Sequence, residues 1–294
     1  MTVDADYKSG KSERDENFPV ASHLISSRHR GPILAFYRFA RAADDAADHA
    51  SLTPDAKLAR LADLEDSLLG KSERAADALP LRAALHKRNL SPQHALDLLK
   101  AFRQDVTKSR YATWEELIDY CRFSAMPVGR FVLDVHGEPK STWTSSDALC
   151  AALQIINHLQ DCGKDYRTIN RIYVPQDELK RYGVEDAAFA REKSSPELLQ
   201  CLHGLAKHTA TLIPTAALLP KCVADLRLAA ETSVIVALAD KLVARLETRD
   251  PLSGGVHLAK SHAALVAGRA VAMTLVRRVG GKRSMYRAVG DDTA

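Results

Sequence analysis

Apolar residues recur at intervals of three and four along most of this chain, and that spacing predicts amphipathic helices. From Phe18 onward no segment shows the strict alternation of apolar and polar residues that a half-buried strand requires. We expect helices over residues 19–50, 54–70, 72–88, 91–106, 113–136, 144–165, 196–219, 224–247 and 259–279. Such a chain buries its apolar stripes helix against helix, so the pattern predicts an all-α fold.

Hydroxyl residues followed by proline mark several of the expected helix starts. Thr53-Pro54, Ser91-Pro92 and Ser195-Pro196 each place a capping hydroxyl before a proline at the first helical position. Thr113 and Glu116 have the spacing of a capping box, in which a hydroxyl and a carboxylate bond the free backbone amides of the first turn.

Prolines and a glycine also predict interruptions. Pro19 and Pro32 should break and restart the first helix before residue 37. Pro127 and Gly129 should weaken the segment 113–136, which leaves two interpretations open. The interruption is either a kink made for packing or a break that opens a ligand cavity beside Phe123.

The domain organisation that we expect is simple. Residues 1–16 are polar and aperiodic, which predicts a disordered tail. Residues 17–290 should form a single all-α domain, with a loop or short helix over 166–184. The composition, 46% hydrophobic and 27% charged, is that of a globular protein with a sizeable core. No apolar run reaches the roughly 18 residues that span a bilayer, so any membrane contact should be peripheral.

Charge and cysteine usage narrow the class of protein further. The net charge of +4, from 41 basic and 37 acidic residues, is too mild to indicate nucleic acid as a partner. The five cysteines form no CxxC pair and follow no secretory signal, so we expect reduced thiols in a cytoplasmic protein. A basic cluster near the end is either a solvated face or a contact with the inner membrane. The cluster comprises Arg277, Arg278, Lys282, Arg283 and Arg287.

Two polar stripes of matching spacing interrupt the apolar pattern. The first comprises Tyr37, Arg41, Asp44 and Asp48, and the second comprises Gln154, Asn157, Asp161 and Asp165. Residues three, four and seven apart share one helix face, so each stripe extends over about 16 Å. A solvated helix face is the alternative, but small and apolar residues flank both sets of acids.

Aspartates stacked on one helix face repel one another, which suggests a bound cation. Oxygen-only ligand sets suit Mg²⁺, which usually shares its coordination with substrate phosphates. We therefore expect two facing helices, packed against each other in the centre of the fold, that hold Mg²⁺ over a diphosphate. Other chemistry has less support, because the chain contains no HExxH, GxGxxG, Walker or nucleophile-elbow motif.

Both stripes resemble the aspartate-rich motifs of the squalene/phytoene synthase family. The first is Arg41-Ala-Ala-Asp-Asp-Ala-Ala-Asp48, and the second runs from Leu153 to Arg167 and is followed by Arg171-Ile-Tyr-Val-Pro175. The segments 16–22, 120–130 and 249–252 are most similar to the bacterial hydroxysqualene synthase branch of hopanoid biosynthesis. The resemblance implies an isoprenoid-synthase helical bundle around a central cavity. It also implies an Mg²⁺-dependent lyase that converts presqualene diphosphate and water to hydroxysqualene and diphosphate.

The resemblance also implies roles for individual residues. The Mg²⁺-diphosphate ligands and catalytic acids would be Asp44, Asp48, Asp161 and Asp165, with Asn157 as a further metal ligand. Arg41 would contact the diphosphate directly, Tyr37 and Arg171 would be weaker contacts, and Gln154 would hydrogen-bond nearby. Phe123 would lie in the substrate pocket, where condensing relatives often carry an aromatic hydroxyl. We also expect Phe36 and Phe131 as wall residues that shield a carbocation.

Two alternatives stay open at this stage. The chain could be a squalene or phytoene synthase that condenses two prenyl diphosphates, although the missing hydroxyl at Phe123 is compatible with an enzyme that only processes a preformed intermediate. It could instead be a non-catalytic relative that binds a lipid or a protein through the same cavity. An upstream presqualene diphosphate synthase is a further expected partner. The sequence does not identify the residue that positions the attacking water.

Overall fold

The computed structural model describes residues 24–290, and residues 279–290 by their backbone alone. The predicted tail over 1–16, the break at Pro19 and the segment 16–22 lie outside the described residues.

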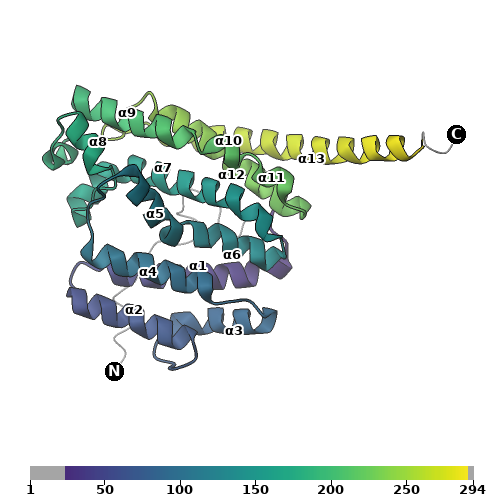
Figure 1. Ribbon diagram of the computed structural model, residues 1–294, viewed down its shortest axis with the longest axis horizontal. Helices are drawn as coiled ribbons and strands as arrows, with labels where there is room; N and C mark the ends of the chain where they lie inside the picture. The colour runs from purple at the N-terminus through teal and green to yellow at the C-terminus, as the bar shows by residue number, and fades with distance from the viewer. Residues whose placement is uncertain (1–23, 291–294) are drawn as a thin grey trace.

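Helices make up nearly all of the described structure, which confirms the predicted all-α class (Figure 1). The α-helices are α1 (Ser27–Asp48), α2 (Pro54–Leu68), α3 (Leu79–Arg88), α4 (Gln93–Thr107), α5 (Trp114–Ser124), α6 (Met126–His136), α7 (Trp143–Ile169), α8 (Gln176–Arg181), α9 (Pro196–Ala210), α10 (Ile213–Ala216), α11 (Leu219–Cys222), α12 (Leu226–Leu246) and α13 (Lys260–Gly290). Short 3-10 helices cover Ala76–Ala78, Lys140–Thr142 and Asp186–Ala190. Within residues 24–290 the β-structure consists of one isolated bridge between Arg110 and Ile172.

Three of the predicted helix starts are capped as the sequence indicates. The Thr53 hydroxyl accepts a hydrogen bond from the Ala56 amide at 3.3 Å. The Ser195 hydroxyl does the same for the Leu198 amide at 3.2 Å, and Thr113 accepts from the Glu116 amide at 3.3 Å. Each bond satisfies a backbone donor that the first turn of a helix leaves free.

The predicted break at Pro32 is wrong, because α1 runs through it without interruption. A proline inside a helix removes the amide that would bond the carbonyl four residues earlier. Here that carbonyl belongs to Arg28, and it accepts a hydrogen bond from the Arg88 guanidinium of α3 instead. A partner from a neighbouring helix therefore replaces the missing bond and keeps α1 whole.

The expected interruption near Pro127 is confirmed. Helix α5 ends at Ser124, α6 begins at Met126, and Ala125 between them leaves helical geometry. Gly129 then lies so close to α7 that an added Cβ would meet Ser146 Oγ at 2.4 Å and Cys150 Sγ at 2.6 Å. The break thus lets α6 approach α7, and it also borders the cavity described below.

Two other boundaries differ from the prediction for a common reason. The segment 196–219 divides into α9, α10 and α11, with Pro214 and Pro220 each in the first turn of a new helix. The helix expected from residue 72 begins at Leu79, again with a proline, Pro80, in its first turn. Proline is favoured there because its missing amide proton has no helical partner to lose.

The helices bury two hydrophobic clusters. One cluster consists mainly of side chains from α1–α4 and part of α6. The other consists mainly of side chains from α5, α7, α9 and α12. Helix α1 packs against α2, α3, α4 and α6, whereas α7 packs against α5, α6, α9, α10 and α12. The prediction that the two striped helices pack directly against each other is therefore wrong, because α6 contacts both of them and lies between.

Helix α13 packs along α12 and continues beyond the rest of the molecule, whereas α2 and α3 form the opposite edge (Figure 1). Within the described residues, no helix combines the length and the apolar character that crossing a bilayer requires.

Candidate active site

The two predicted stripes lie on α1 and α7, and all eight of their side chains are half-buried. Arg171, just beyond the end of α7, connects the two sides. Its guanidinium forms an ion pair with Asp48 of α1 at 3.2 Å and donates a hydrogen bond to the Asp105 backbone carbonyl at 2.8 Å. Arg171 is only 6% exposed, so these contacts are made away from bulk water, where ion pairs and hydrogen bonds are stronger than in water. The sequence prediction rated this arginine as a minor contact, and the structure gives it a central position.

Arg41 belongs to the first stripe and is paired within its own helix. Its guanidinium contacts Asp44 at 2.7 Å and Asp45 at 3.3 Å. These intrahelical pairs reduce the repulsion among the stacked aspartates. They also place a positive charge on the helix face where a diphosphate is expected.

Carboxylates of the two stripes are close enough to influence one another's ionisation. The pKa of Asp165 is raised to about 7, first because the group is buried and next because Asp161 lies on the same helix face. Asp48, from the other stripe, raises the pKa further, while Lys164 and Arg171 oppose the shift. The two acidic sets therefore lie within electrostatic range of each other, although α6 lies between their helices.

A buried polar cluster beside Arg171 went undetected in the sequence. Tyr120 donates a hydrogen bond to the Asp105 carboxylate at 2.9 Å, and Arg171 donates one to the Tyr173 hydroxyl at 3.2 Å. Burial raises the pKa of Asp105 to about 7, against the opposing effects of Arg171 and the Tyr120 hydrogen bond. His158 stacks on Tyr173 with ring centroids 3.3 Å apart.

Sequence did contain a signal for this cluster. Asp105 occupies a position on the buried face of α4 where the repeat of Leu98 and Ala101 calls for an apolar residue. A carboxylate at such a position is costly to bury, so it more often marks a site than a solvated surface.

The donor set fits a hard divalent cation. Asp44, Asp48, Asn157, Asp161 and Asp165 offer oxygen atoms only, which is the ligand chemistry that Mg²⁺ prefers. In the described part of the chain, however, no three His, Cys, Asp or Glu side chains are already grouped as a metal site. Two of these carboxylates, Asp44 and Asp48, instead pair with Arg41 and Arg171, so their side chains would have to rearrange to hold an ion.

A mainly apolar cavity of about 280 Å³ begins at the second stripe. Gln154 and Asn157 form part of its wall on α7, and Leu149 and Leu153 continue the wall along the same helix. The remaining walls come from α1, α6, α11 and α12, and aliphatic side chains such as Val132 and Ile235 dominate them. The cavity thus extends from the polar stripe into a dry, aliphatic interior.

Four further polar side chains interrupt the aliphatic wall, of which Ser146 lies on α7. Ser124 ends α5, while Glu231 and Thr232 lie on α12. Glu231 is 2% exposed and is the one charged side chain among the described residues that line the cavity. In α12 it takes a position between Leu228 and Ile235 that helical spacing assigns to the apolar face, so sequence alone could have flagged it.

The remaining predicted site residues have different positions. Tyr37 lies half-buried on the first stripe. Phe123 packs on the core with the Lys100 ammonium 5.2 Å from its ring centroid, and it is not among the residues that line the cavity. Phe36 and Phe131 stack on each other at 4.1 Å within a hydrophobic core cluster rather than in the cavity wall.

Several known proteins are similar to this chain over most of its length. The family model described as squalene/phytoene synthase matches residues 12–262. A hydroxysqualene synthase of Rhodopseudomonas palustris is 55% identical over 96% of this chain and 97% of its own length. That of Sinorhizobium fredii is 52% identical over 99% of this chain and 100% of its own length.

A solved structure and a more distant sequence relative extend the comparison. The crystal structure of squalene synthase HpnC from Alicyclobacillus acidocaldarius superposes with a TM-score of 0.68 at 30% identity, over 76% of this chain and 85% of that one. A plant phytoene synthase, from Narcissus pseudonarcissus, is 34% identical over 60% of this chain and 43% of its own length.

Proposed function

The chain belongs to the squalene/phytoene synthase family, and we propose that it acts within this family as a hydroxysqualene synthase. It converts presqualene diphosphate and water to hydroxysqualene and diphosphate. The observation that carries this conclusion is the identity of about half of all residues to hydroxysqualene synthases over nearly the full length of both chains. The phytoene synthase from Narcissus matches less of the chain at lower identity, which disfavours the condensing alternative.

The site supports an ionisation that leaves diphosphate at the polar end and a carbocation in the cavity. Arg41 and Arg171 supply positive charge where the leaving group develops negative charge, and this kind of electrostatic stabilisation lowers the barrier. Bound Mg²⁺, held by Asp44, Asp48, Asn157, Asp161 and Asp165, would supply Lewis-acid stabilisation of the same oxygens.

The apolar cavity performs the second task, because a carbocation reacts with any nucleophile that reaches it. Leu149, Leu153, Val132 and Ile235 exclude bulk water from the carbon chain. The wall is aliphatic rather than aromatic, so shielding by exclusion accounts for more of its effect than contact with aromatic faces.

Product analysis tests the function directly. The enzyme incubated with presqualene diphosphate and Mg²⁺ should release diphosphate and form hydroxysqualene. Farnesyl diphosphate alone should give little product. Formation of a C30 hydrocarbon or of presqualene diphosphate from farnesyl diphosphate would instead identify a condensing synthase, and no diphosphate release from any C15 to C30 substrate would favour a binding protein.

Substitution of the ligand set tests the assignment of its residues. Asp44→Ala and Asp161→Ala should each abolish diphosphate release while the helical circular dichroism stays unchanged. Asp119→Ala is the matched control, because Asp119 is an exposed aspartate of α5 paired only with Arg122 in the ion pairs we find. Near-normal turnover by either stripe variant, or turnover that survives exhaustive chelation, would contradict the proposed metal site.

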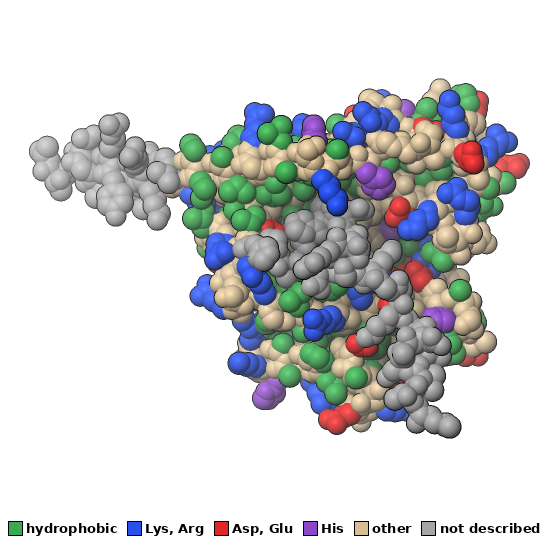
Figure 2. Space-filling model, turned by 180° about the vertical axis from the view of Figure 1, so that it is seen from behind, with side chains coloured by type: hydrophobic (Ala, Val, Ile, Leu, Met, Phe, Trp, Pro, Cys, Tyr) green, Lys and Arg blue, Asp and Glu red, His purple; other side chains and the backbone are tan. Residues whose placement is uncertain are grey.

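We further propose a cytoplasmic enzyme with peripheral contact at the inner membrane, since its C30 substrate and product are lipids. Helix α13 contains seven Lys or Arg residues and no acidic residue, and Leu265 and Val276 on it are 73% and 71% exposed. Figure 2 shows hydrophobic and basic side chains side by side where this helix leaves the body. Such a surface suits anionic lipid headgroups. Docking on the synthase that supplies presqualene diphosphate would bury the same exposed side chains.

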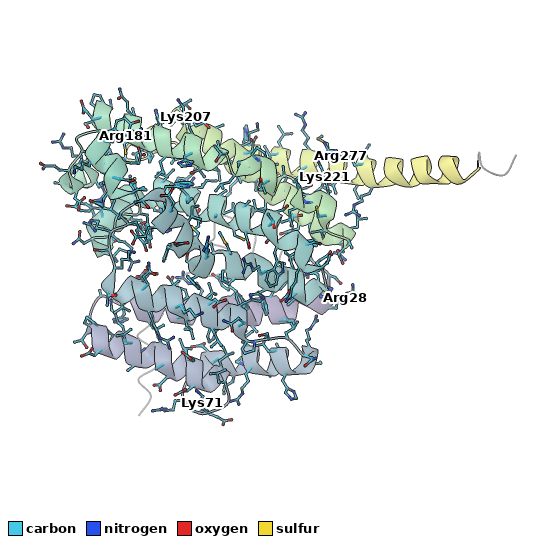
Figure 3. All side chains as sticks on the ribbon, in the orientation of Figure 1. Arg28, Lys71, Arg181, Lys207, Lys221 and Arg277 are labelled. Carbon is cyan, nitrogen blue, oxygen red and sulfur yellow. The ribbon has the colours of Figure 1, made fainter. Side chains whose placement is uncertain are left out.

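Vesicle pelleting separates these two partners. The protein should pellet with phosphatidylcholine vesicles that contain phosphatidylglycerol, and much less with phosphatidylcholine alone. Arg269→Glu combined with Arg277→Glu should weaken the binding. Lys71→Glu is the control, because Lys71 lies at the edge of the molecule opposite Arg277 (Figure 3). No binding to either vesicle would reject the membrane contact and leave the protein partner as the explanation of this surface.

A further inference from the structure

Ser124 is the last residue of α5 and forms part of the cavity wall at the break before α6. Its hydroxyl oxygen is buried and has no hydrogen-bond partner among the residues that the structure describes. A buried polar group without a partner costs free energy, and most such groups are satisfied by protein or by ordered water. Because Ser124 lines the cavity, a water molecule held there beside it would satisfy this hydroxyl.

A second serine of the same cavity differs in this respect. Ser146, on α7, also lines the wall, but its side chain is hydrogen-bonded to the Cys150 thiol. Thr232 likewise donates its hydroxyl hydrogen bond within its own helix, to the Leu228 carbonyl at 2.9 Å. Of the three hydroxyl groups of the described cavity wall, Ser124 is therefore the one available to bind a molecule inside it.

The packing of α5 and α6 on α7 places Ser124 near the polar end of the cavity. Tyr120, one turn before Ser124, lies level with His158, since their rings are 6.1 Å apart. Gly129, five residues after Ser124, lies level with Ser146 and Cys150. The two segments are therefore antiparallel, and Ser124 falls between these levels, beside the turn of α7 that carries Gln154 and Asn157.

We propose that the Ser124 hydroxyl holds the water molecule that captures the carbocation. This inference rests on the proposed function. The C–O bond to the diphosphate breaks with its electron pair on the leaving group, and the carbon skeleton rearranges. An oxygen lone pair of the held water then forms the new C–O bond of hydroxysqualene. The proton that this oxygen loses goes to the departed diphosphate, a base that the reaction itself supplies at that end of the cavity.

The experiment compares Ser124→Ala with Ser146→Ala, the same change at two positions in one cavity. Each variant is given presqualene diphosphate and Mg²⁺, and two quantities are measured: diphosphate released, and the share of C30 product that is hydroxysqualene. Ser124→Ala should keep diphosphate release but lower the alcohol share about tenfold, a change of about 1.4 kcal/mol. The missing share should emerge as hydrocarbons formed by proton loss. Ser146→Ala should leave the product ratio unchanged, and Ser124→Thr should restore the alcohol.

Several results would overturn the assignment. One is an alcohol share in Ser124→Ala equal to that of the unmodified enzyme, and another is an equal shift in Ser146→Ala. A parallel loss of diphosphate release and alcohol in Ser124→Ala would show a structural role and would also reject it. Failure of the proposed function gives a different result, because the unmodified enzyme would then form no hydroxysqualene at all.

Discussion

Arg171 makes contacts that a lysine cannot reproduce. Its planar guanidinium reaches the Asp48 carboxylate, the Asp105 carbonyl and the Tyr173 hydroxyl together. A lysine ammonium is a compact charge without this fork of donors. We predict that Arg171→Lys lowers kcat/KM about 10- to 100-fold, equivalent to about 1.4–2.7 kcal/mol of transition-state stabilisation. Steady-state kinetics with presqualene diphosphate measures the effect.

Arg181→Lys provides the control, since Arg181 is exposed and pairs with Glu178 on the surface of α8. Surface pairs of this kind contribute little. Kinetics of Arg171→Lys that match those of Arg181→Lys would show that charge alone is needed at position 171.

The sequence predicted which residues share a helix face wherever those residues recur at helical spacing. The eight stripe residues share a period, and the structure places each set on one helix. Arg171 follows α7 without such a period, so its position between Asp48 and Asp105 depends on how the chain turns back at Asn170, which adopts a left-handed conformation. Local sequence does not encode that turn's direction. The prediction that Phe36 and Phe131 line the cavity was wrong, because a hydrophobic side chain is buried equally well in a core cluster and in a cavity wall.

Two glycines in different helices, Gly129 and Gly268, allow a test of helix packing. An alanine Cβ at position 129 would lie 2.4 Å from Ser146 Oγ and 2.6 Å from Cys150 Sγ, so these two side chains or helix α6 would have to shift. Gly129→Ala should therefore lower the free energy of unfolding by about 1–3 kcal/mol, the usual cost of overpacking. Thermal or denaturant unfolding followed by circular dichroism measures it.

Gly268→Ala makes the same change in α13, where an added Cβ meets nothing within 4 Å. Alanine is the better helix former, so this variant should gain a few tenths to about 1 kcal/mol. Equal shifts in both variants would mean that the α6–α7 contact at Gly129 does not limit stability.

Helix boundaries show which local signals can be trusted and which depend on tertiary contacts. Pro54, Pro80 and Pro196 all lie in the first turn of a helix, where the missing amide proton removes no helical hydrogen bond. Pro32 has the same chemistry but lies inside α1, because Arg88 from another helix satisfies the carbonyl that it leaves free. Nothing in the sequence near Pro32 indicates that Arg88 will bond the Arg28 carbonyl, so the continuity of α1 through Pro32 could not be predicted.

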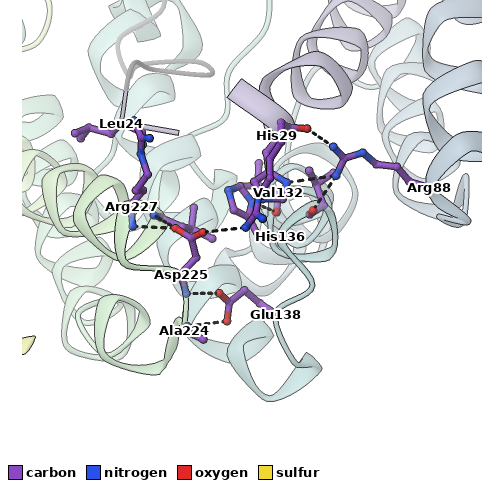
Figure 4. A network of polar contacts seen from close by, with 12 residues as sticks. Leu24, His29, Arg88, Val132, His136, Glu138, Ala224, Asp225 and Arg227 are labelled. Atoms are coloured by element: carbon purple, nitrogen blue, oxygen red, sulfur yellow. Dashed lines mark hydrogen bonds and ion pairs between the residues drawn. The ribbon is translucent and has the colours of Figure 1, made fainter. Parts of the chain in front are cut away.

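The junction of α1, α3 and α6 predicts a dependence of stability on pH. His29 of α1 is buried, its ring centroid lies 4.1 Å from that of His136, and its Nδ1 lies 3.3 Å from the Arg88 guanidinium (Figure 4). Its pKa is lowered to about 4, first by burial and then by the positive charge of His136, Arg28 and Arg88. Between about pH 4 and 6.5 the unfolded chain therefore binds a proton that the folded protein does not.

Stability from this group is fully present above pH 6.5 and is lost as the pH falls toward 4, with a slope of at most about 1.4 kcal/mol per pH unit. His29→Gln should remove that part of the slope, whereas His86→Gln, at an exposed position of α3, should not. Denaturant unfolding at several pH values measures both. An unchanged slope in His29→Gln would assign the acid sensitivity to other groups.

At the scale of the whole molecule, the two stripes lie on helices that contribute to different hydrophobic clusters. Asp44 and Asp48 belong to α1, which contributes to the core cluster of α1–α4, whereas Asp161 and Asp165 belong to α7, which contributes to the other cluster. A ligand that engages both stripes would therefore connect helices that contribute to different core clusters. Binding to the folded state alone raises its stability by mass action.

We predict that inorganic diphosphate and Mg²⁺ together raise the Tm by several degrees, because a ligand at 100 times its Kd contributes about 2.7 kcal/mol. Each component alone should do much less, because a diphosphate without Mg²⁺ is repelled by the four aspartates of the stripes, and Mg²⁺ without diphosphate does not link the two stripes. Asp161→Ala should lose the joint effect although its own fold persists. A full shift with Mg²⁺ alone, or the same shift in Asp161→Ala, would mean that the ion binds elsewhere and that the two stripes do not share one ligand.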